Sequence, residues 1–248
     1  MPLHSRVDVQ EARRMTFQLG FNASDGVLLA SDLKHTSLYG YRTSQIAPKI
    51  KISKTQKMAC CSAGDTDFCF ALENIVNRAL SDGSAKFTGS PIMVRQLLFD
   101  CLRRAQEEDE AYRQKSRLPT TIGGSTIFAF RDGPVVDLWT VRATGQFPEI
   151  SLVLPGECVK AGDANSPAVF FPERYLEKLP NTVEALIPLA VHTVLMAEGE
   201  FVKGVEIGIF TQSAFRVLTG EELAPFLDMS KRLDTTILEE FHKAGKLQ

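Results

Sequence analysis

The stretch that decides the fold is Met15–Asp32, which reads MTFQLGFNASDGVLLASD. Two apolar runs, Thr16–Asn22 and Val27–Asp32, flank a short polar segment in which the pair Asp25-Gly26 is a tight-turn signal. The second run is apolar at consecutive positions, which is typical of a strand that is covered on both faces. The stretch therefore predicts a buried hairpin that begins with a threonine and ends with an aspartate.

The rest of the chain alternates between groups of strands and groups of helices. Further strands are predicted at 49–52, 57–63, 125–131, 135–142, 149–154, 158–162, 205–211 and 214–219. Helical spacing of apolar residues predicts helices at 65–81, 91–113, 171–178 and 182–197, followed by a charged amphipathic tail at 221–246. Strands buried on both faces and interrupted by paired helices indicate two packed sheets with helices outside each. We therefore predict an α+β fold in the form of a four-layer αββα sandwich.

Length and charge exclude several classes of protein. The 248 residues fit one globular domain, or at most two small ones. The balance of 28 basic against 30 acidic side chains argues against nucleic acid as a partner. No apolar run approaches the roughly 20 residues that a membrane helix needs. Residues 1–15 lack the apolar core of a secretory signal. We expect a cytoplasmic protein that does not contact membranes.

The cysteines and histidines do not form a metal or disulfide pattern. Five cysteines without paired spacing argue against a disulfide framework. The neighbouring pair Cys60-Cys61 is not a Cys-x-x-Cys motif, and the four histidines are scattered. Buried, small apolar side chains are the favoured interpretation of the cysteines. We expect neither a metal nor any other cofactor.

Four polar features occupy the ends of the predicted strands. Thr16 begins the first strand, Asp32 ends the second, and Lys49 begins a further strand. The segment Ser62-Ala-Gly-Asp-Thr-Asp67 joins a buried strand to a helix. Together these residues resemble the β-type subunits of the proteasome and its bacterial relatives, a branch of the N-terminal nucleophile hydrolases. In that family the first strand begins with the nucleophilic threonine.

The resemblance implies a set of site residues. It assigns catalytic roles to Thr16, Asp32, Lys49 and the backbone at Ala63, and substrate binding to Thr36. It places His35, Cys61 and Asp65 near the specificity pocket, although loop and core roles explain these three residues equally well. The family's second supporting cluster is altered here: Asp163 stands where a serine is usual, and Glu200, or alternatively Glu198, replaces an aspartate.

The chemistry of these residue types agrees with the implied roles. A threonine hydroxyl is a weak nucleophile that needs an adjacent base, and a free α-amine on the same residue has a pKa near neutrality. A cationic Lys49 lowers the pKa of the hydroxyl, and a carboxylate such as Asp32 keeps a partly buried lysine charged. The alternative interpretation is that Asp32 caps a turn and that Lys49 is a solvated edge charge.

This chemistry requires Thr16 to be the first residue of the mature chain. Residues 1–15 are either a propeptide that the threonine removes autocatalytically or a segment upstream of a true start at Met15. Removal of a methionine before threonine also frees the amine, and we favour this second route. Residues 16–248 are then one hydrolase domain whose helical tail is 221–248.

The leading hypothesis is a threonine-type endopeptidase that acts on peptides or unfolded proteins. The resemblance implies a homo-oligomeric ring or a related assembly, with heterologous contacts between subunits and an ATPase or other regulator as a candidate partner. A non-catalytic scaffold with the same fold is a second hypothesis, motivated by the altered second cluster. A small-amide hydrolase or transpeptidase is the third, because a fold does not settle a function.

Overall fold

The computed structural model describes residues 16–37, 43–83, 85–117, 123–143, 148–162, 166–198 and 202–245. Two five-stranded sheets form the centre, and every strand pairing in them is antiparallel. The strands of the first sheet are, in order, β10 (Cys158–Gly162), β1 (Phe17–Ala23), β2 (Gly26–Ser31), β11 (Glu206–Thr211) and β12 (Phe215–Val217). Those of the second are β5 (Lys51–Ile52), β6 (Met58–Gly64), β7 (Gly124–Asp132), β8 (Val135–Arg142) and β9 (Glu149–Val153).

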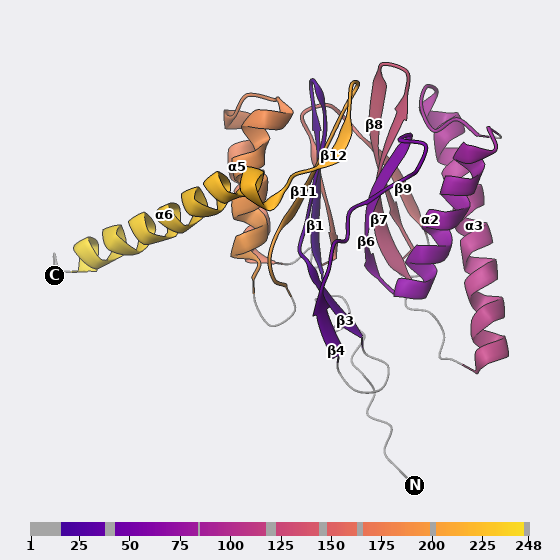
Figure 1. Ribbon diagram of the computed structural model, residues 1–248, viewed down its shortest axis with the longest axis horizontal. Coiled ribbons are helices and arrows are strands. Elements are labelled where there is room, and N and C mark those ends of the chain that lie inside the picture. The colour runs from indigo at the N-terminus through magenta and orange to yellow at the C-terminus, as the bar shows by residue number, and fades with distance from the viewer. Residues whose placement is uncertain are drawn as a thin grey trace, which may run out of the picture.

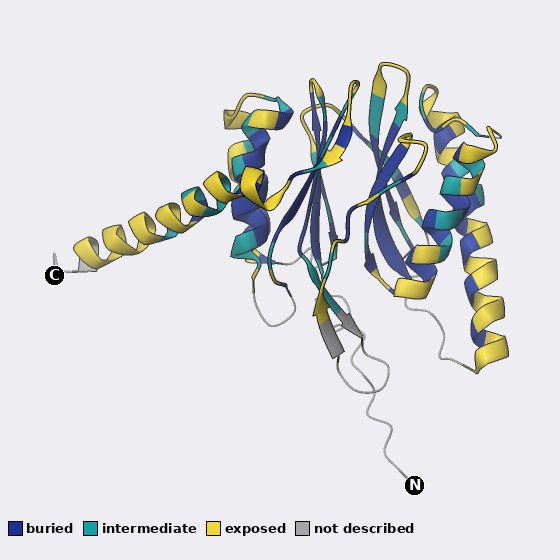
Figure 2. Ribbon diagram, viewed as in Figure 1, coloured by how far each residue is buried: buried dark blue, intermediate teal, exposed yellow. Residues whose placement is uncertain are grey.

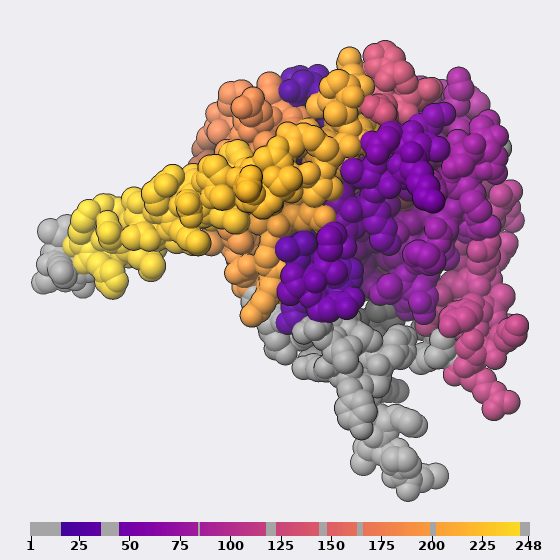
Figure 3. Space-filling view, in the orientation of Figure 1, coloured from indigo at the N-terminus to yellow at the C-terminus, as the bar shows by residue number. Residues whose placement is uncertain are grey.

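Helices lie on the outer side of each sheet (Figure 1). The helices α2 (Thr66–Ser81) and α3 (Pro91–Ser116) flank the second sheet. The helices α4 (Phe170–Tyr175) and α5 (Val183–Met196) lie on the side of the first sheet. Two 3-10 turns, η1 (Pro167–Val169) and η2 (Leu176–Lys178), directly precede and follow α4. The last helix, α6 (Gly220–Gly245), starts against α5 and extends away from the body, as Figure 3 also shows.

Three apolar clusters hold these elements together, and buried residues line both faces of the central strands (Figure 2). One cluster lies between the first sheet and α5, and a second lies between the second sheet and helices α2 and α3. The third fills the space between the two sheets. In β2, Val27 and Leu29 belong to the third cluster whereas Leu28 and Ala30 belong to the first, as the period of two in a strand requires.

The predicted hairpin is present. All seven residues of β1 are buried, and β1 pairs with β2 from Gln18 opposite Ser31 to Ala23 opposite Gly26. Two turn residues, Ser24 and Asp25, join the strands. The hairpin therefore returns the chain to the level of Thr16, the predicted nucleophile.

The mixed α+β class predicted from the sequence is confirmed, with two differences in detail. The sequence analysis missed a two-stranded hairpin, β3 (Lys34–Ser37) with β4 (Thr43–Ile46). It was wrong to start a strand at Lys49, because β5 begins at Lys51 and the N–H groups of the two preceding residues bind a side chain instead of a neighbouring strand. Among the described residues, no helix is both long enough and apolar enough to cross a membrane.

Candidate active site

The antiparallel hairpin brings Thr16 and Asp32 together although they are sixteen positions apart. Thr16 directly precedes β1 and Asp32 directly follows β2. The N–H of Asp32 donates to the carbonyl of Phe17 at 3.1 Å, and the N–H of Phe17 donates to Asp32 Oδ1 at 2.9 Å. Asp32 Oδ2 also accepts the N–H of Lys34 at 3.0 Å. The Asp32 carboxylate is thus fixed by two backbone donors in addition to any side chain.

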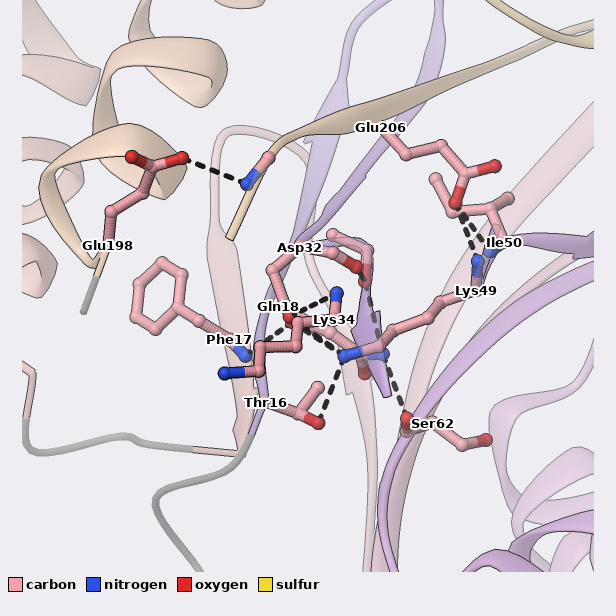
Figure 4. Close-up of polar contacts among 12 residues, drawn as sticks. Thr16, Phe17, Gln18, Asp32, Lys34, Lys49, Ile50, Ser62, Glu198 and Glu206 are labelled. Carbon is pink, nitrogen blue, oxygen red and sulfur yellow. Dashed lines mark hydrogen bonds and ion pairs between the residues drawn. The ribbon is translucent and has the colours of Figure 1, made fainter. Parts of the chain in front are cut away.

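The Lys49 side chain completes the cluster (Figure 4). Its ammonium Nζ lies 2.8 and 2.9 Å from the two carboxylate oxygens of Asp32 and donates to Thr16 Oγ1 at 3.1 Å. Asp32 is 0% exposed and Lys49 is 6% exposed, so the ion pair is shielded from water. The structure therefore brings together three of the residues predicted for the site.

Burial governs the electrostatics of this pair. It raises the pKa of Asp32 above its ordinary value, although Lys49 and the backbone donors act in the opposite direction. It lowers the pKa of Lys49 below its ordinary value, against the attraction of Asp32. Both directions follow from the cost of burying a charge, and they narrow the pH range in which both groups are ionised.

A second layer of contacts surrounds the start of β1. Gln18, which lies on the same face of the strand as Thr16, is 0% exposed. Its Nε2 donates to the carbonyl of Ser62 at 2.9 Å and to Ser31 Oγ at 3.3 Å, which ties β1 to β6 of the other sheet. Gly162 in β10 approaches the same point: its φ is +84°, and a Cβ there would collide with the carbonyl oxygen of Thr16.

Ala63, predicted to supply a backbone donor, lies near this point. A Cβ built on Gly162 would be 3.3 Å from the Cβ of Ala63 and in collision with the carbonyl of Thr16. The following residue, Gly64, has a φ of +125°, and any side chain there would strike the backbone of the Gly123-Gly124 pair. Glycine is therefore required at the strand end beside Ala63. The donor role of the Ala63 N–H stays a prediction.

Cys61 and Asp65 have structural contacts. Cys61 is 0% exposed and belongs to the apolar cluster between the sheets, where burial raises the pKa of its thiol. Asp65 caps α2 by accepting the N–H of Asp67 at 3.1 Å, and it pairs with Arg113 of α3 at 2.6 Å. These contacts agree with the core interpretation of both residues, and their role near a specificity pocket stays a prediction.

The remaining predicted residues are placed only in part. His35 and Thr36 lie in β3, where Thr36 pairs with Ser44, but the side chain of Thr36 lies outside the described atoms. Asp163 and Glu200 lie outside the described residues. Their predicted roles stay predictions.

Glu198 was the alternative to Glu200, and its contact is local. It accepts the N–H of Gly204 at 2.8 Å on the protein surface and lies apart from the Thr16 cluster in Figure 4. This contact does not connect Glu198 to the predicted nucleophile.

The sequence analysis missed Glu206, whose carboxylate is next to Lys49. Glu206 Oε2 accepts the N–H groups of Lys49 at 2.8 Å and Ile50 at 2.9 Å. Glu206 is 6% exposed although its side chain is acidic. The available signal was an acidic residue inside the apolar run 205–211, because a charged side chain in a buried strand needs a partner.

The arrangement suits activation of a hydroxyl group. An ammonium in hydrogen-bond contact with a threonine oxygen stabilises negative charge on that oxygen, and the buried carboxylate keeps the ammonium in place. Within the described ranges, no group of three or more histidine, cysteine or acidic side chains is arranged to hold a metal ion.

Comparison with known proteins identifies the fold. No family model matches the chain, and no curated protein sequence matches it. Anbu from Yersinia bercovieri, described as an ancestral β-subunit, aligns in structure with a TM-score of 0.67 at 12% identity, over 92% of this chain and 97% of that chain. The chain shares the fold of Anbu. Two structures of Anbu from Hyphomicrobium sp. strain MC1, one of them a Gly-1 mutant, give TM-scores of 0.65 and 0.66 at 13% identity with the same coverage.

This likeness agrees with the proteasome-like resemblance of the sequence. At 12–13% identity, it establishes a proteasome-like fold and not a reaction. The reaction has to be argued from the contacts of Thr16, Asp32 and Lys49.

Proposed function

We propose that the chain is a proteasome-like threonine hydrolase that cleaves peptide bonds in peptides or unfolded proteins. In this proposal the layers form the αββα sandwich of the N-terminal nucleophile hydrolases, and Thr16 is the nucleophile. The observation that carries the proposal is the position of the Lys49 ammonium, which contacts Thr16 Oγ1 at 3.1 Å and both oxygens of the buried Asp32.

The first chemical step forms an ester. With Thr16 at the chain terminus, its α-amine accepts the hydroxyl proton while Oγ1 bonds to the carbonyl carbon of the substrate. The Lys49 ammonium stabilises the charge on Oγ1, and the N–H of Ala63 donates to the substrate oxygen. The carbon–nitrogen bond then breaks as the protonated amine of Thr16 gives its proton to the leaving nitrogen. The acyl group stays on Oγ1.

The second step releases the acyl group. Water gives a proton to the same α-amine and attacks the ester carbonyl carbon. The bond to Oγ1 breaks, the proton returns to Oγ1, and a carboxylic acid leaves. Asp32 takes part throughout by holding Lys49, and it does not exchange a proton with the substrate.

The proposal includes processing and assembly. Either residues 1–15 are removed as a propeptide, or translation starts at Met15 and that methionine is trimmed, so that the amine of Thr16 is free. The chain works in the cytoplasm as part of a homo-oligomeric ring or related assembly, which keeps an otherwise unselective site away from folded proteins.

The experiment combines N-terminal mapping with covalent labelling. Intact mass and N-terminal sequencing of protein from its native host should show a chain that begins at Thr16. A peptide epoxyketone, which needs both a hydroxyl and a neighbouring amine to form its ring adduct, should then add to that residue. Thr16→Ala should abolish the adduct, whereas Thr236→Ala, at an exposed threonine of α6, should not.

The outcomes separate the hypotheses. A chain that keeps residues 1–15 and resists the probe would refute the hydrolase proposal and favour a scaffold. A labelled Thr16 combined with hydrolysis of small amides, but of no peptide in a library, would refute the peptidase assignment while leaving the nucleophile in place.

A further inference from the structure

The backbone just before β5 depends on a carboxylate from the other sheet. Strand β5 pairs with β6 only through Lys51 and Ile52, so the ladder does not extend to the two residues before them. Both of these residues, Lys49 and Ile50, are 6% exposed, and a buried N–H group without an acceptor is costly. Oε2 of Glu206 accepts both N–H groups, at 2.8 and 2.9 Å.

Glu206 and Asp32 both bind Lys49, and they lie at the neighbouring ends of two adjacent strands. Glu206 is the first residue of β11 and lies opposite Ser31 of β2, which directly precedes Asp32. Asp32 holds the ammonium of Lys49, and Glu206 holds its main chain, as Figure 4 shows. One sheet therefore fixes both ends of the Lys49 side chain.

The side chain of the neighbouring residue adds an apolar anchor. Ile50 is part of the cluster between the two sheets. An apolar contact restrains the segment toward the core, but it does not set the direction of a backbone. Two hydrogen bonds that consecutive N–H groups donate to one carboxylate oxygen do set that direction, because a hydrogen bond weakens steeply as its donor–hydrogen–acceptor angle departs from linear.

We propose that Glu206 is a positioning residue for Lys49: its carboxylate fixes the main chain from which the ammonium reaches Thr16 Oγ1 and Asp32. This inference rests on the proposed function, in which Lys49 stabilises the nucleophile. Glu206 does not touch the reacting atoms. Its effect is to hold Lys49 within the narrow range of positions in which a catalytic contact is effective, since misplacement by about 1 Å can cost on the order of a hundredfold in rate.

If Glu206 only stabilised the fold, its replacement would lower stability without a specific effect on Lys49. Three variants separate this structural role from the positioning role. Glu206→Ala removes the acceptor, and Glu206→Gln keeps an oxygen acceptor without the charge. Asp25→Ala is the matched control, because Asp25 Oδ1 accepts the N–H of Val183 at 2.8 Å at the far end of the β1–β2 hairpin. Each variant is studied as the full mature chain, at temperatures well below its own unfolding midpoint.

The first measurement is the rate of epoxyketone addition to Thr16 at several probe concentrations. Glu206→Ala should lower the maximal rate by about tenfold or more while the half-saturating concentration changes by less than about threefold. Glu206→Gln should recover to within about threefold of the wild-type rate, since it keeps the acceptor. Asp25→Ala should change neither parameter by more than about twofold even if it is equally destabilised.

The second measurement does not require activity. Protein labelled with carbon-13 at lysine Cε gives a Lys49 signal that Lys49→Arg assigns, and its titration reports the environment of the ammonium. Glu206→Ala should move that titration toward an ordinary lysine value, because a released main chain lets the ammonium leave the buried pair. Glu206→Gln and Asp25→Ala should leave it close to wild type.

Each combination of results decides a point. If the wild type does not label but the Lys49 titration shifts in Glu206→Ala, the proposed function would be refuted. The proposal that Glu206 positions Lys49 would still be supported. Normal labelling by Glu206→Ala would overturn the positioning role and leave the hydrolase proposal intact. An unchanged Lys49 titration in Glu206→Ala would overturn the positioning role whether or not the wild type labels.

Discussion

The ion pair between Asp32 and Lys49 makes a quantitative prediction through a double-mutant cycle. Asp32 is 0% exposed and accepts from Lys49 Nζ and from the N–H groups of Phe17 and Lys34. Asp32→Asn keeps an acceptor for the backbone but leaves the buried Lys49 ammonium without the carboxylate that it contacts. Breaking a buried pair in this way costs about 3–5 kcal/mol, so we expect the free energy of unfolding to fall by about 4 kcal/mol.

Replacing Lys49 instead of Asp32 should lower the free energy of unfolding by slightly less. Lys49→Met leaves the Asp32 carboxylate with its two backbone donors, which offset part of the penalty, and we expect a loss of about 3 kcal/mol. The double variant removes both charges of this pair and should lose about 4 kcal/mol, well below the sum of the single losses. The coupling energy is then about 3 kcal/mol, at the upper end of values for residues in contact.

Urea unfolding can measure this cycle. The single tryptophan, Trp139, is 2% exposed, so its fluorescence reports loss of the core. The titrations should be repeated at several protein concentrations, because assembly adds to apparent stability. Asp228→Asn with Lys231→Met is the matched control: that pair is exposed, with 3.9 Å between its charged atoms, and its coupling should stay below about 1 kcal/mol. A loss under about 1 kcal/mol for Asp32→Asn, or additive single changes, would refute the reasoning.

Three further predictions concern pH and packing. Burial lowers the pKa of Lys49, so its cation is lost as pH rises through this lowered pKa. The rate of Thr16 labelling should therefore start to decline below pH 10.4, about the ordinary lysine pKa; a rate that is constant up to about pH 10.4 would contradict this. Gly162→Ala should abolish labelling and lower stability by more than about 1 kcal/mol, since its Cβ meets the carbonyl of Thr16, whereas Gly133→Ala, also at positive φ but in open space, should leave labelling unchanged. Burial lowers the pKa of His192, so the stability that the neutral ring contributes is complete above about pH 6.5 and is lost as pH falls through the lowered value; His192→Gln should flatten this acid dependence in urea titrations, and an unchanged slope would exclude His192 as its source.

The meeting of Thr16 and Asp32 could be predicted from the sequence because the contact is local. Two apolar runs with a turn signal between them give an antiparallel hairpin, and the first and last residues of a hairpin are neighbours. The strand register confirms the predicted hairpin, since Gln18 lies opposite Ser31. The helices were predictable for a similar reason: their apolar residues recur within a single segment.

Glu206 and Gln18 could not be placed in the same way, because their partners are distant in the sequence. The hydrogen bond from the N–H of Lys49 to Glu206 spans 157 residues, and the bond from Gln18 to Ser62 spans 44. No periodic pattern encodes such contacts. What the sequence does offer is a polar residue within an apolar run, which predicts a satisfied buried contact without naming its partner.

Asp65 shows how one residue can support two interpretations. The family resemblance placed it near a specificity pocket, whereas an aspartate directly before a helix is also typical of an N-cap. In the structure it accepts N–H groups of α2 and pairs with Arg113 of α3. The partner lies 48 positions away in the sequence, so only the fold reveals that the carboxylate joins two helices.

The position of Lys49 therefore depends on how the two sheets pack. Thr16 and Asp32 lie at the ends of strands in the first sheet, while Lys49 lies on the segment that leads into the second. Ile50 sits between the sheets, and Glu206 reaches across from the first sheet to the same segment. A change in the spacing of the sheets would move the ammonium relative to the threonine oxygen without altering any of the three residues. The chemistry attributed to residues 16–49 consequently requires a strand near residue 206, and the local motif alone is an incomplete description of the site.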